Sequence, residues 1–206
     1  MADDDVSAPS YWNDLYLAGD AGWDKGKPSP PIVRMAGEKG LLPAGASIAV
    51  LGAGRGHEAV ALAKKGFRVT AIDFAAEAVK AIRANAKKAK VELEALQADV
   101  FTLPASHAGA FDAALEHTCF CAIDPERRAE YAAMARAILK PGGIFFGLFY
   151  AHGRDGGPPF TTTEAEVRRL FAPHFGIDRL VVPKDGFPER KGNELEFVFR
   201  ATPARS

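Results

Sequence analysis

Short apolar runs alternate with amphipathic stretches along most of the chain from residue 47 onward. Continuous apolar runs of four to eight residues are typical of strands that are buried on both faces of a parallel sheet. The pattern predicts strands at 48–51, 67–72, 92–96, 111–115, 144–150, 177–182 and 194–201. Helical spacing of apolar residues predicts helices between them at 58–65, 75–89, 126–139 and 163–171.

The order of these elements indicates the fold class. Strands and helices alternate through five units, which is typical of an α/β protein with a parallel sheet. The last two strands are joined by the polar stretch 183–193, which is too short for a crossover helix and suits an antiparallel hairpin. We therefore expect a seven-stranded, mostly parallel sheet that ends in a C-terminal antiparallel hairpin. This hairpin distinguishes the pattern from an all-parallel dinucleotide-binding fold.

The first 45 residues follow a different pattern. Two short helices are predicted at 11–17 and 32–39, separated by the glycine-rich stretch 19–26, which contains Trp23, and by a proline cluster at 28–31. We expect a single domain over residues 1–206, in which residues 1–45 form an N-terminal helical lid over a core of 46–206. The mobile part of this lid is predicted at 11–26.

Composition narrows the function classes. The 206 residues suffice for one domain, and 26 basic residues balance 26 acidic ones, so no net field attracts nucleic acid or an anionic membrane. Cys119 and Cys121 alone cannot build a disulfide framework or a four-cysteine zinc site, and no metal is expected. The acidic start is unlike a secretory signal, and no apolar run approaches the ~20 residues of a membrane span. We expect a cytoplasmic monomer that acts on a small molecule.

A glycine-rich loop lies between the first predicted strand and the helix that follows it. Its glycines, Gly52, Gly54 and Gly56, permit sharp turns and a close approach of the backbone to a ligand. A nicotinamide-binding loop would carry its third glycine at position 57, where this chain has His57. The G-x-G-x-G spacing instead favours S-adenosylmethionine (SAM). The alternative is a tight strand-to-helix turn without a ligand.

Two acidic residues follow the next two strands. Asp73 lies 21 residues after Gly52 and is placed to accept hydrogen bonds from ribose hydroxyls; alternatively, it caps the helix at 75–89. Asp99 follows the third strand and is placed to bind an adenine amino group, with Val100 packing on the base. Its alternative is a turn aspartate. Together, the glycine loop, Asp73, and the pair Asp99 and Val100 are a stronger signal for a SAM site than any one of them alone.

Three further segments complete a longer pattern. They are Trp12-x-x-x-Tyr16 with Trp23-Asp24-x-Gly26, the run from Phe111 to Pro125, and Gly156-Gly157-Pro158-Pro159-Phe160. With these segments, the chain resembles the thiopurine S-methyltransferase superfamily of class I methyltransferases, over roughly Tyr11 to Arg200. It is especially similar to the plant thiol, thiocyanate and halide methyltransferase branch. Phe160 stands where that branch has tyrosine, so a hydroxyl that could touch a halide acceptor is missing.

The resemblance implies a Rossmann-like class I fold that uses SAM and releases S-adenosylhomocysteine (SAH). It also implies a set of cofactor-binding residues: Trp12, Tyr16, Trp23, Gly52, Gly54, Gly56, Asp73, Asp99, Val100 and His117. A closed aromatic pocket would shed water from an anionic nucleophile, and we expect Phe120 and Phe160 to contribute to it. Arg154 is a candidate contact for an anionic substrate.

We therefore expect methyl transfer to a small sulfur nucleophile, namely a thiol, hydrosulfide or thiocyanate, and possible use of halide. No constellation of a catalytic base is evident, and no catalytic residue is assigned. Cys119 and Cys121 are interpreted as buried, unreactive thiols. The alternatives are an aromatic thiol or thiopurine acceptor, a selenium or tellurium acceptor, a non-catalytic SAM-binding module, and a nicotinamide-dependent reductase. His57 and the terminal hairpin argue against the last.

Overall fold

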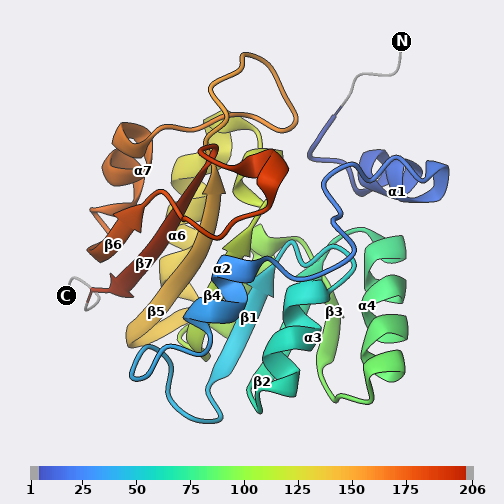
Figure 1. Ribbon diagram of the computed structural model, residues 1–206, viewed down its shortest axis with the longest axis horizontal. Helices are drawn as coiled ribbons and strands as arrows, with labels where there is room; N and C mark the ends of the chain where they lie inside the picture. Colours follow the sequence, from blue (N-terminus) through green and yellow to red (C-terminus); the bar gives the residue numbers. More distant parts are fainter. Residues whose placement is uncertain (1–4, 203–206) are drawn as a thin grey trace.

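A mixed sheet lies at the centre of the computed structural model, which describes residues 5–202, and helices cover both of its faces (Figure 1). Its strands are β1 (Ser47–Leu51), β2 (Arg68–Asp73), β3 (Glu94–Gln97), β4 (Phe111–His117), β5 (Leu139–Tyr150), β6 (Phe175–Val181) and β7 (Glu194–Ala201). The α-helices are α1 (Pro9–Ala18), α2 (Pro30–Met35), α3 (His57–Lys64), α4 (Ala76–Ala89), α5 (Leu103–His107), α6 (Arg128–Ala137) and α7 (Glu164–Phe171). Short 3-10 helices are η1 (Val100–Thr102), η2 (Phe120–Ala122), η3 (Pro125–Arg127) and η4 (Pro188–Arg190).

The strand order is β3-β2-β1-β4-β5-β7-β6. β1 pairs in parallel with both β2 and β4, whereas β7 is antiparallel to both β5 and β6. The predicted mostly parallel sheet with a C-terminal antiparallel hairpin is confirmed. After β3 the chain returns to the other side of β1. The carboxyl ends of β1 and β4 therefore form a topological switch point, where open α/β sheets bind ligands.

Side chains alternate between the two faces of the sheet. On β1, Ile48 and Val50 pack with α2 and α3, whereas Ala49 and Leu51 face the opposite layer. That second layer contains α6 and α7 and a cluster of phenylalanines: Phe145, Phe149, Phe171, Phe175, Phe197 and Phe199. Burial on both faces explains why β1 is apolar at every position from Ile48 to Leu51.

The N-terminal segment divides into two parts. Ile32 and Met35 of α2 are completely buried against β1, so the structure places α2 in the core rather than in a lid. Arg34 of the same helix binds Asp185 at 2.8 Å and also contacts Glu196, which fastens α2 to the C-terminal hairpin. Helix α1 buries none of its residues and lies to one side of the sheet (Figure 1).

Most predicted element boundaries agree with the structure to within a few residues. Residue Thr163 caps α7 by accepting a hydrogen bond from the Glu166 N–H at 3.1 Å. The strand predicted at 144–150 begins earlier, because β5 starts at Leu139, which pairs with Phe111 of β4, and includes the stretch 140–143. The stretch stays in the strand because Pro141 lies at an exposed position. Between residues 5 and 202, no helix is both long and apolar enough to cross a membrane.

Candidate active site

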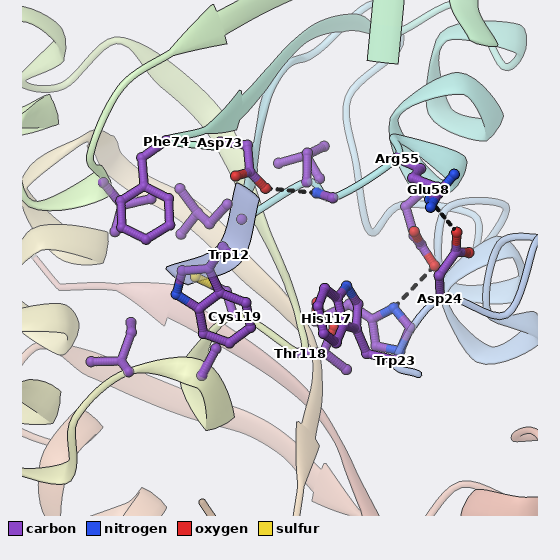
Figure 2. Close-up of a pocket in the computed structure, with 18 of the residues that line it drawn as sticks. Trp12, Trp23, Asp24, Arg55, Glu58, Asp73, Phe74, His117, Thr118 and Cys119 are labelled. Carbon is purple, nitrogen blue, oxygen red and sulfur yellow. Dashed lines mark hydrogen bonds and ion pairs between the residues drawn. The ribbon is translucent and has the colours of Figure 1, made fainter. Parts of the chain in front are cut away.

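The first of two adjoining pockets opens at the carboxyl ends of β1, β2 and β4, beneath the N-terminal segment (Figure 2). It brings together nearly all of the residues predicted to bind a cofactor. Those that line it are Trp12, Tyr16, Trp23, Gly52, Gly54, Asp73, Asp99, Val100 and His117. Residues separated by more than 100 positions in the sequence therefore meet at the switch point of the sheet.

The glycine loop runs so close to its neighbours that a side chain would not fit at Gly52 and would be crowded at Gly54. Gly52 and Gly54 both have φ of +55°, in the left-handed region that favours glycine. A Cβ atom on Gly52 would lie 2.7 Å from the Cys119 Sγ, and one on Gly54 would lie 3.2 Å from the Tyr16 hydroxyl. Gly56 does not line the pocket; it caps α3 with φ of +77° and packs on Ile82. It supports the turn rather than the ligand surface.

Asp73 ends β2 and faces the same pocket (Figure 2). Its Oδ2 accepts a hydrogen bond from the Gly54 N–H at 2.9 Å, and its Oδ1 accepts one from the Ala75 N–H at 3.0 Å. The second bond fixes the turn that leads into α4, but the N-cap of that helix is Ala75 and no side chain caps it, so the helix-capping alternative is not what the structure shows. Burial raises the pKa of Asp73 to about 6, although the backbone donors oppose the shift.

The loop after β3 forms the other end of the pocket. Asp99 caps η1 by accepting a hydrogen bond from the Phe101 N–H at 3.0 Å, and Val100 is 8% exposed. The Arg127 guanidinium lies 3.6 Å from the centre of the Phe101 ring. The predicted pair of an acid and a hydrophobe is therefore brought to the pocket, on a rigid turn.

Aromatic residues of the N-terminal segment cover the pocket. The Trp23 ring packs edge-on against Trp12 at 5.4 Å and against Tyr16 at 5.5 Å, measured between ring centroids. The following residue, Asp24, ties the segment to the glycine loop, because it pairs with both Arg55 and His57 at 2.9 Å (Figure 2). The cover is thus anchored to the loop that it faces.

His117, at the end of β4, belongs to a buried charge network. Its Nδ1 lies 3.0 Å from the Glu58 Oε1, and because a carboxylate only accepts, the ring proton lies on Nδ1. Burial disfavours the imidazolium, but the Glu58 and Glu194 carboxylates outweigh it and raise the pKa of His117. Its Nε2 lies 3.1 Å from Arg190 Nη1, and Arg190 Nη2 donates to the Trp23 carbonyl at 3.0 Å. The network joins the sheet, the hairpin and the N-terminal cover.

Glu116, which is completely buried, fixes the loop after β4 through two hydrogen bonds. Its Oε1 accepts a hydrogen bond from the Phe120 N–H at 2.8 Å, and its Oε2 accepts one from the Tyr131 hydroxyl. Burial raises the pKa of Glu116 to about 7. Between Glu116 and Phe120, Thr118 has φ of +65°, an outlier for a β-branched residue that is often found at functional sites.

The two cysteines line different pockets. Cys119 lines the first pocket, and Cys121 lines the second. Burial, with the Glu116 carboxylate nearby, raises the pKa of Cys119 well above its usual value and that of Cys121 to about 12. Thiols of this kind stay protonated and are poor nucleophiles, in agreement with the prediction of unreactive cysteines. Among residues 5–202, no group of three or more histidine, cysteine or acidic side chains is arranged to hold a metal ion.

The second pocket adjoins the first along Trp12, Trp23, Lys25, Thr118 and Ala122, which line both. Its other residues come from four separate regions: α1 and the loop after it, η2 with Cys121, the segment 150–159, and η4. Three cations, Lys25, Arg154 and Arg190, face two carboxylates, Asp20 and Glu189. Arg154, the predicted substrate contact, lines this second pocket, beside the one that holds most of the predicted cofactor-binding residues.

Two predicted substrate contacts are corrected by the structure, which places them in neither pocket. Phe120 is 1% exposed because η2 turns its ring into the aromatic core, 5.1 Å from Phe149. Phe160 is held by a hydrogen bond from its N–H to the Cys121 carbonyl at 2.7 Å, and its ring packs over Gly157. Both residues shape the loops around the site rather than the surface of a ligand.

Several lining residues escaped the sequence argument. Arg55, Glu58 and Arg190 are isolated charges in the sequence, and only the fold brings them to the pocket. Asp24 was quoted as part of the aromatic signature, but its pairing with Arg55 could not be deduced from spacing. The sequence signal for Arg55 and Asp24 is that each directly follows a motif residue, Gly54 and Trp23.

Comparisons with known proteins agree on a family. Residues 7–202 match the family model described as Thiopurine S-methyltransferase (TPMT). The chain is 33% identical to a probable thiol methyltransferase 2 of Arabidopsis thaliana, over 79% of this chain and 71% of the relative. It is 32% identical to thiocyanate methyltransferase 1 of the same plant, over 84% and 76%.

A solved structure gives the same fold with a different acceptor. The 1,6-didemethyltoxoflavin-N1-methyltransferase of Burkholderia thailandensis, solved with bound SAH, superimposes with a TM-score of 0.75. The match covers 96% of this chain and 88% of that one at 23% identity. The likeness establishes a Rossmann-like class I methyltransferase fold.

Proposed function

The chain belongs to the thiopurine S-methyltransferase family and is a SAM-dependent methyltransferase, and from this premise we propose that its acceptor is a small sulfur nucleophile: a thiol, hydrosulfide or thiocyanate. The observation that carries the proposal is the second pocket, which adjoins the first and is lined by Lys25, Arg154 and Arg190. Lys25 and Arg190 are paired with Glu189 and Glu194, whereas Arg154 has no ion pair with a described residue. An excess of cationic side chains favours an anionic acceptor.

The residues of the first pocket fit the cofactor. Gly52 and Gly54 line the pocket with backbone alone, and Asp73 offers carboxylate oxygens at the end of β2. We assign Asp73 to the ribose and Asp99 with Val100 to the adenine. When bound, SAM supplies a methyl group on a positively charged sulfur, which a nucleophile attacks directly. The protein's part is to hold both molecules in register and to exclude water.

The second pocket suits an acceptor that arrives already ionised. Its described lining residues include no histidine, and its two carboxylates face three cations, so no neutral base is on hand. Thiolates and thiocyanate need none. Arg154 makes no ion pair with any described residue and contacts only His152, with its Nε 3.3 Å from the ring Nδ1. It is the cation freest to bind an anion. The walls of Trp12, Trp23 and Tyr150 would strip water from the nucleophile.

An aromatic thiol is the second candidate, and a specific observation favours it. The second pocket is lined by four aromatic side chains, Tyr11, Trp12, Trp23 and Tyr150. Aromatic rings stack edge-on or offset against such walls, with about 0.5–1.5 kcal/mol beyond the area that they bury. A thiophenol or thiopurine would use these rings, whereas hydrosulfide and thiocyanate would use mainly the charge of the arginines.

A panel of acceptors tests the proposal. Purified protein is incubated with SAM and, separately, with hydrosulfide, methanethiol, thiocyanate, iodide, thiophenol and a thiopurine. SAH formation and volatile methylated products are then measured by chromatography. We expect turnover with the small sulfur anions. The Arg154→Gln variant should raise KM for thiocyanate about tenfold without changing the SAH affinity.

A matched control uses Arg169→Gln, which removes an exposed arginine of α7 that lines neither pocket. It should behave as the wild type. A higher kcat/KM for thiophenol than for hydrosulfide and thiocyanate would favour the second candidate. SAH binding with no turnover of any sulfur compound would overturn the acceptor assignment while leaving the family intact.

A further inference from the structure

The first pocket has two chemically different ends. Asp73 and Asp99, at the ends of β2 and β3, define the end assigned to the nucleoside. Because the strand order is β3-β2-β1-β4, the opposite end lies at β4, where His117 and Glu58 are found. A ligand that carries adenosine at one end and an amino acid at the other must place its ammonium and carboxylate there. The inference below rests on this part of the proposed function.

Most charges at the β4 end are already paired. Arg55 and His57 both bind Asp24 at 2.9 Å, and Glu58 accepts hydrogen bonds from His117 and from the Ser29 N–H at 3.0 Å. Asp24 and Glu58 would repel a free carboxylate that entered this end. A carboxylate can therefore bind only where a cation is available to it.

Lys27 is such a cation. It lines the first pocket, and among the described residues it has no hydrogen bond or ion pair; its Nζ lies 5.7 Å from the centre of the Phe187 ring. Lys25, by contrast, binds Glu189 at 3.4 Å. Phe187 is 3% exposed, and its carbonyl accepts a hydrogen bond from the Arg190 N–H. Arg190 in turn contacts His117, so Lys27 lies on the side of the pocket that holds the His117 network.

The backbone on both sides of Lys27 is fixed. Asp24 anchors the chain to the glycine loop, and Ser29, which is completely buried, anchors it to Glu58. Because the backbone is already held, binding of a ligand by Lys27 costs only the rotamer entropy of its side chain. We propose that Lys27 binds the carboxylate of the cofactor's amino-acid end, opposite Glu58, and thereby couples cofactor binding to the position of the N-terminal cover.

A comparison of two ligands tests the proposal. SAH carries the amino-acid end, and 5′-methylthioadenosine is the same nucleoside thioether without it. Calorimetric titration of both ligands is performed on the wild type, Lys27→Gln and Lys27→Arg. Lys27→Gln should weaken SAH binding about tenfold, which is the loss of one hydrogen bond to a charged group at an exposed site. It should leave 5′-methylthioadenosine unchanged, and Lys27→Arg should retain most of the SAH affinity.

Lys39→Gln is the matched control, because Lys39 is exposed after α2 and lines neither pocket. It should bind both ligands as the wild type does. The assignment of Lys27 is overturned if Lys27→Gln weakens both ligands equally or leaves SAH unaffected. Failure of the proposed function gives a different result, since a wild type that binds SAH but methylates no sulfur acceptor leaves the Lys27 comparison intact.

Discussion

The acid at the end of β2 should make cofactor binding depend on pH in a range where few carboxylates titrate. Burial raises the pKa of Asp73 to about 6. Ribose hydroxyls donate hydrogen bonds to the ionised carboxylate, and protonation removes that acceptor. SAH affinity should therefore be full above pH 7 and should fall as the pH drops through 6.

The size of the effect follows from the fraction of Asp73 that is ionised. One pH unit below its pKa, about one tenth of the protein carries the charged form, so the SAH Kd at pH 5 should be about tenfold higher than at pH 7.5. Asp73→Asn should weaken SAH by about ten- to a hundredfold at pH 7.5, the loss of a charged acceptor. In addition, the asparagine NH₂ group would face one of the two backbone N–H groups, of Gly54 and Ala75, that donate hydrogen bonds to the carboxylate of Asp73.

The assay is calorimetric titration of SAH at pH 5, 6, 7 and 8, with circular dichroism at each pH to establish that the protein is folded. The wild-type Kd should rise toward low pH, and the Asp73→Asn Kd should be flat. Because the variant retains Asp24, Glu58 and His117, the difference between the two curves isolates Asp73 from the other charges of the pocket. Parallel curves for the two proteins would refute the reasoning.

Three further results are expected. Burial raises the pKa of Glu116 from 4.5 to about 7, so the folded state binds its proton more tightly than the unfolded state does. The free energy of unfolding should therefore fall by about 3 kcal/mol as the pH rises from 5 to 8. In urea titrations Glu116→Gln should flatten this dependence, and an unchanged slope would exclude Glu116 as its source. Replacing Cys119 and Cys121 together by serine should preserve most methyl transfer, because both thiols stay protonated; complete loss of turnover in a folded variant would contradict this. Trp23→Ala should raise the cofactor KM and lower kcat with little change in the melting temperature of the ligand-free protein, and hydrogen exchange over residues 11–26 should slow when SAH binds; equally slow exchange without ligand would show that the segment is part of the core.

Regular patterns made most of the fold predictable. Strand β7 lies at the predicted residues, Glu194–Ala201, because apolar residues recur at every second position from Leu195 to Ala201 and face the core. The start of β5 was missed because a proline and glycines normally end an element, whereas here Leu139 pairs across the stretch with Phe111. The five-residue helix α5 is too short to show a helical period.

The candidate site was predictable where its chemistry is local in sequence. The glycine loop and the acids that follow β2 and β3 lie at fixed offsets from strand ends, so their positions follow from the sheet. The direction of Phe120 does not, because a 3-10 turn decides whether the ring faces a pocket or the core. The contact between His117 and Arg190 joins residues 73 positions apart, and neither has a sequence signal that names the other.

The loop after β4 explains how acceptor chemistry can change while the fold stays constant. Thr118 lines both pockets in a backbone conformation that costs a β-branched residue about 1–3 kcal/mol. The buried hydrogen bonds of Glu116 to Phe120 and Tyr131 fix the chain on either side, and they offset that cost. The junction of the pockets is therefore set from inside the core. Apart from Cys121 of η2, the rest of the second pocket comes from α1 and the loop after it, the segment 150–159 and η4. None of these segments contains Asp73 or Asp99, the acids that we assign to the cofactor, so the acceptor must be deduced from the second pocket and not from the fold.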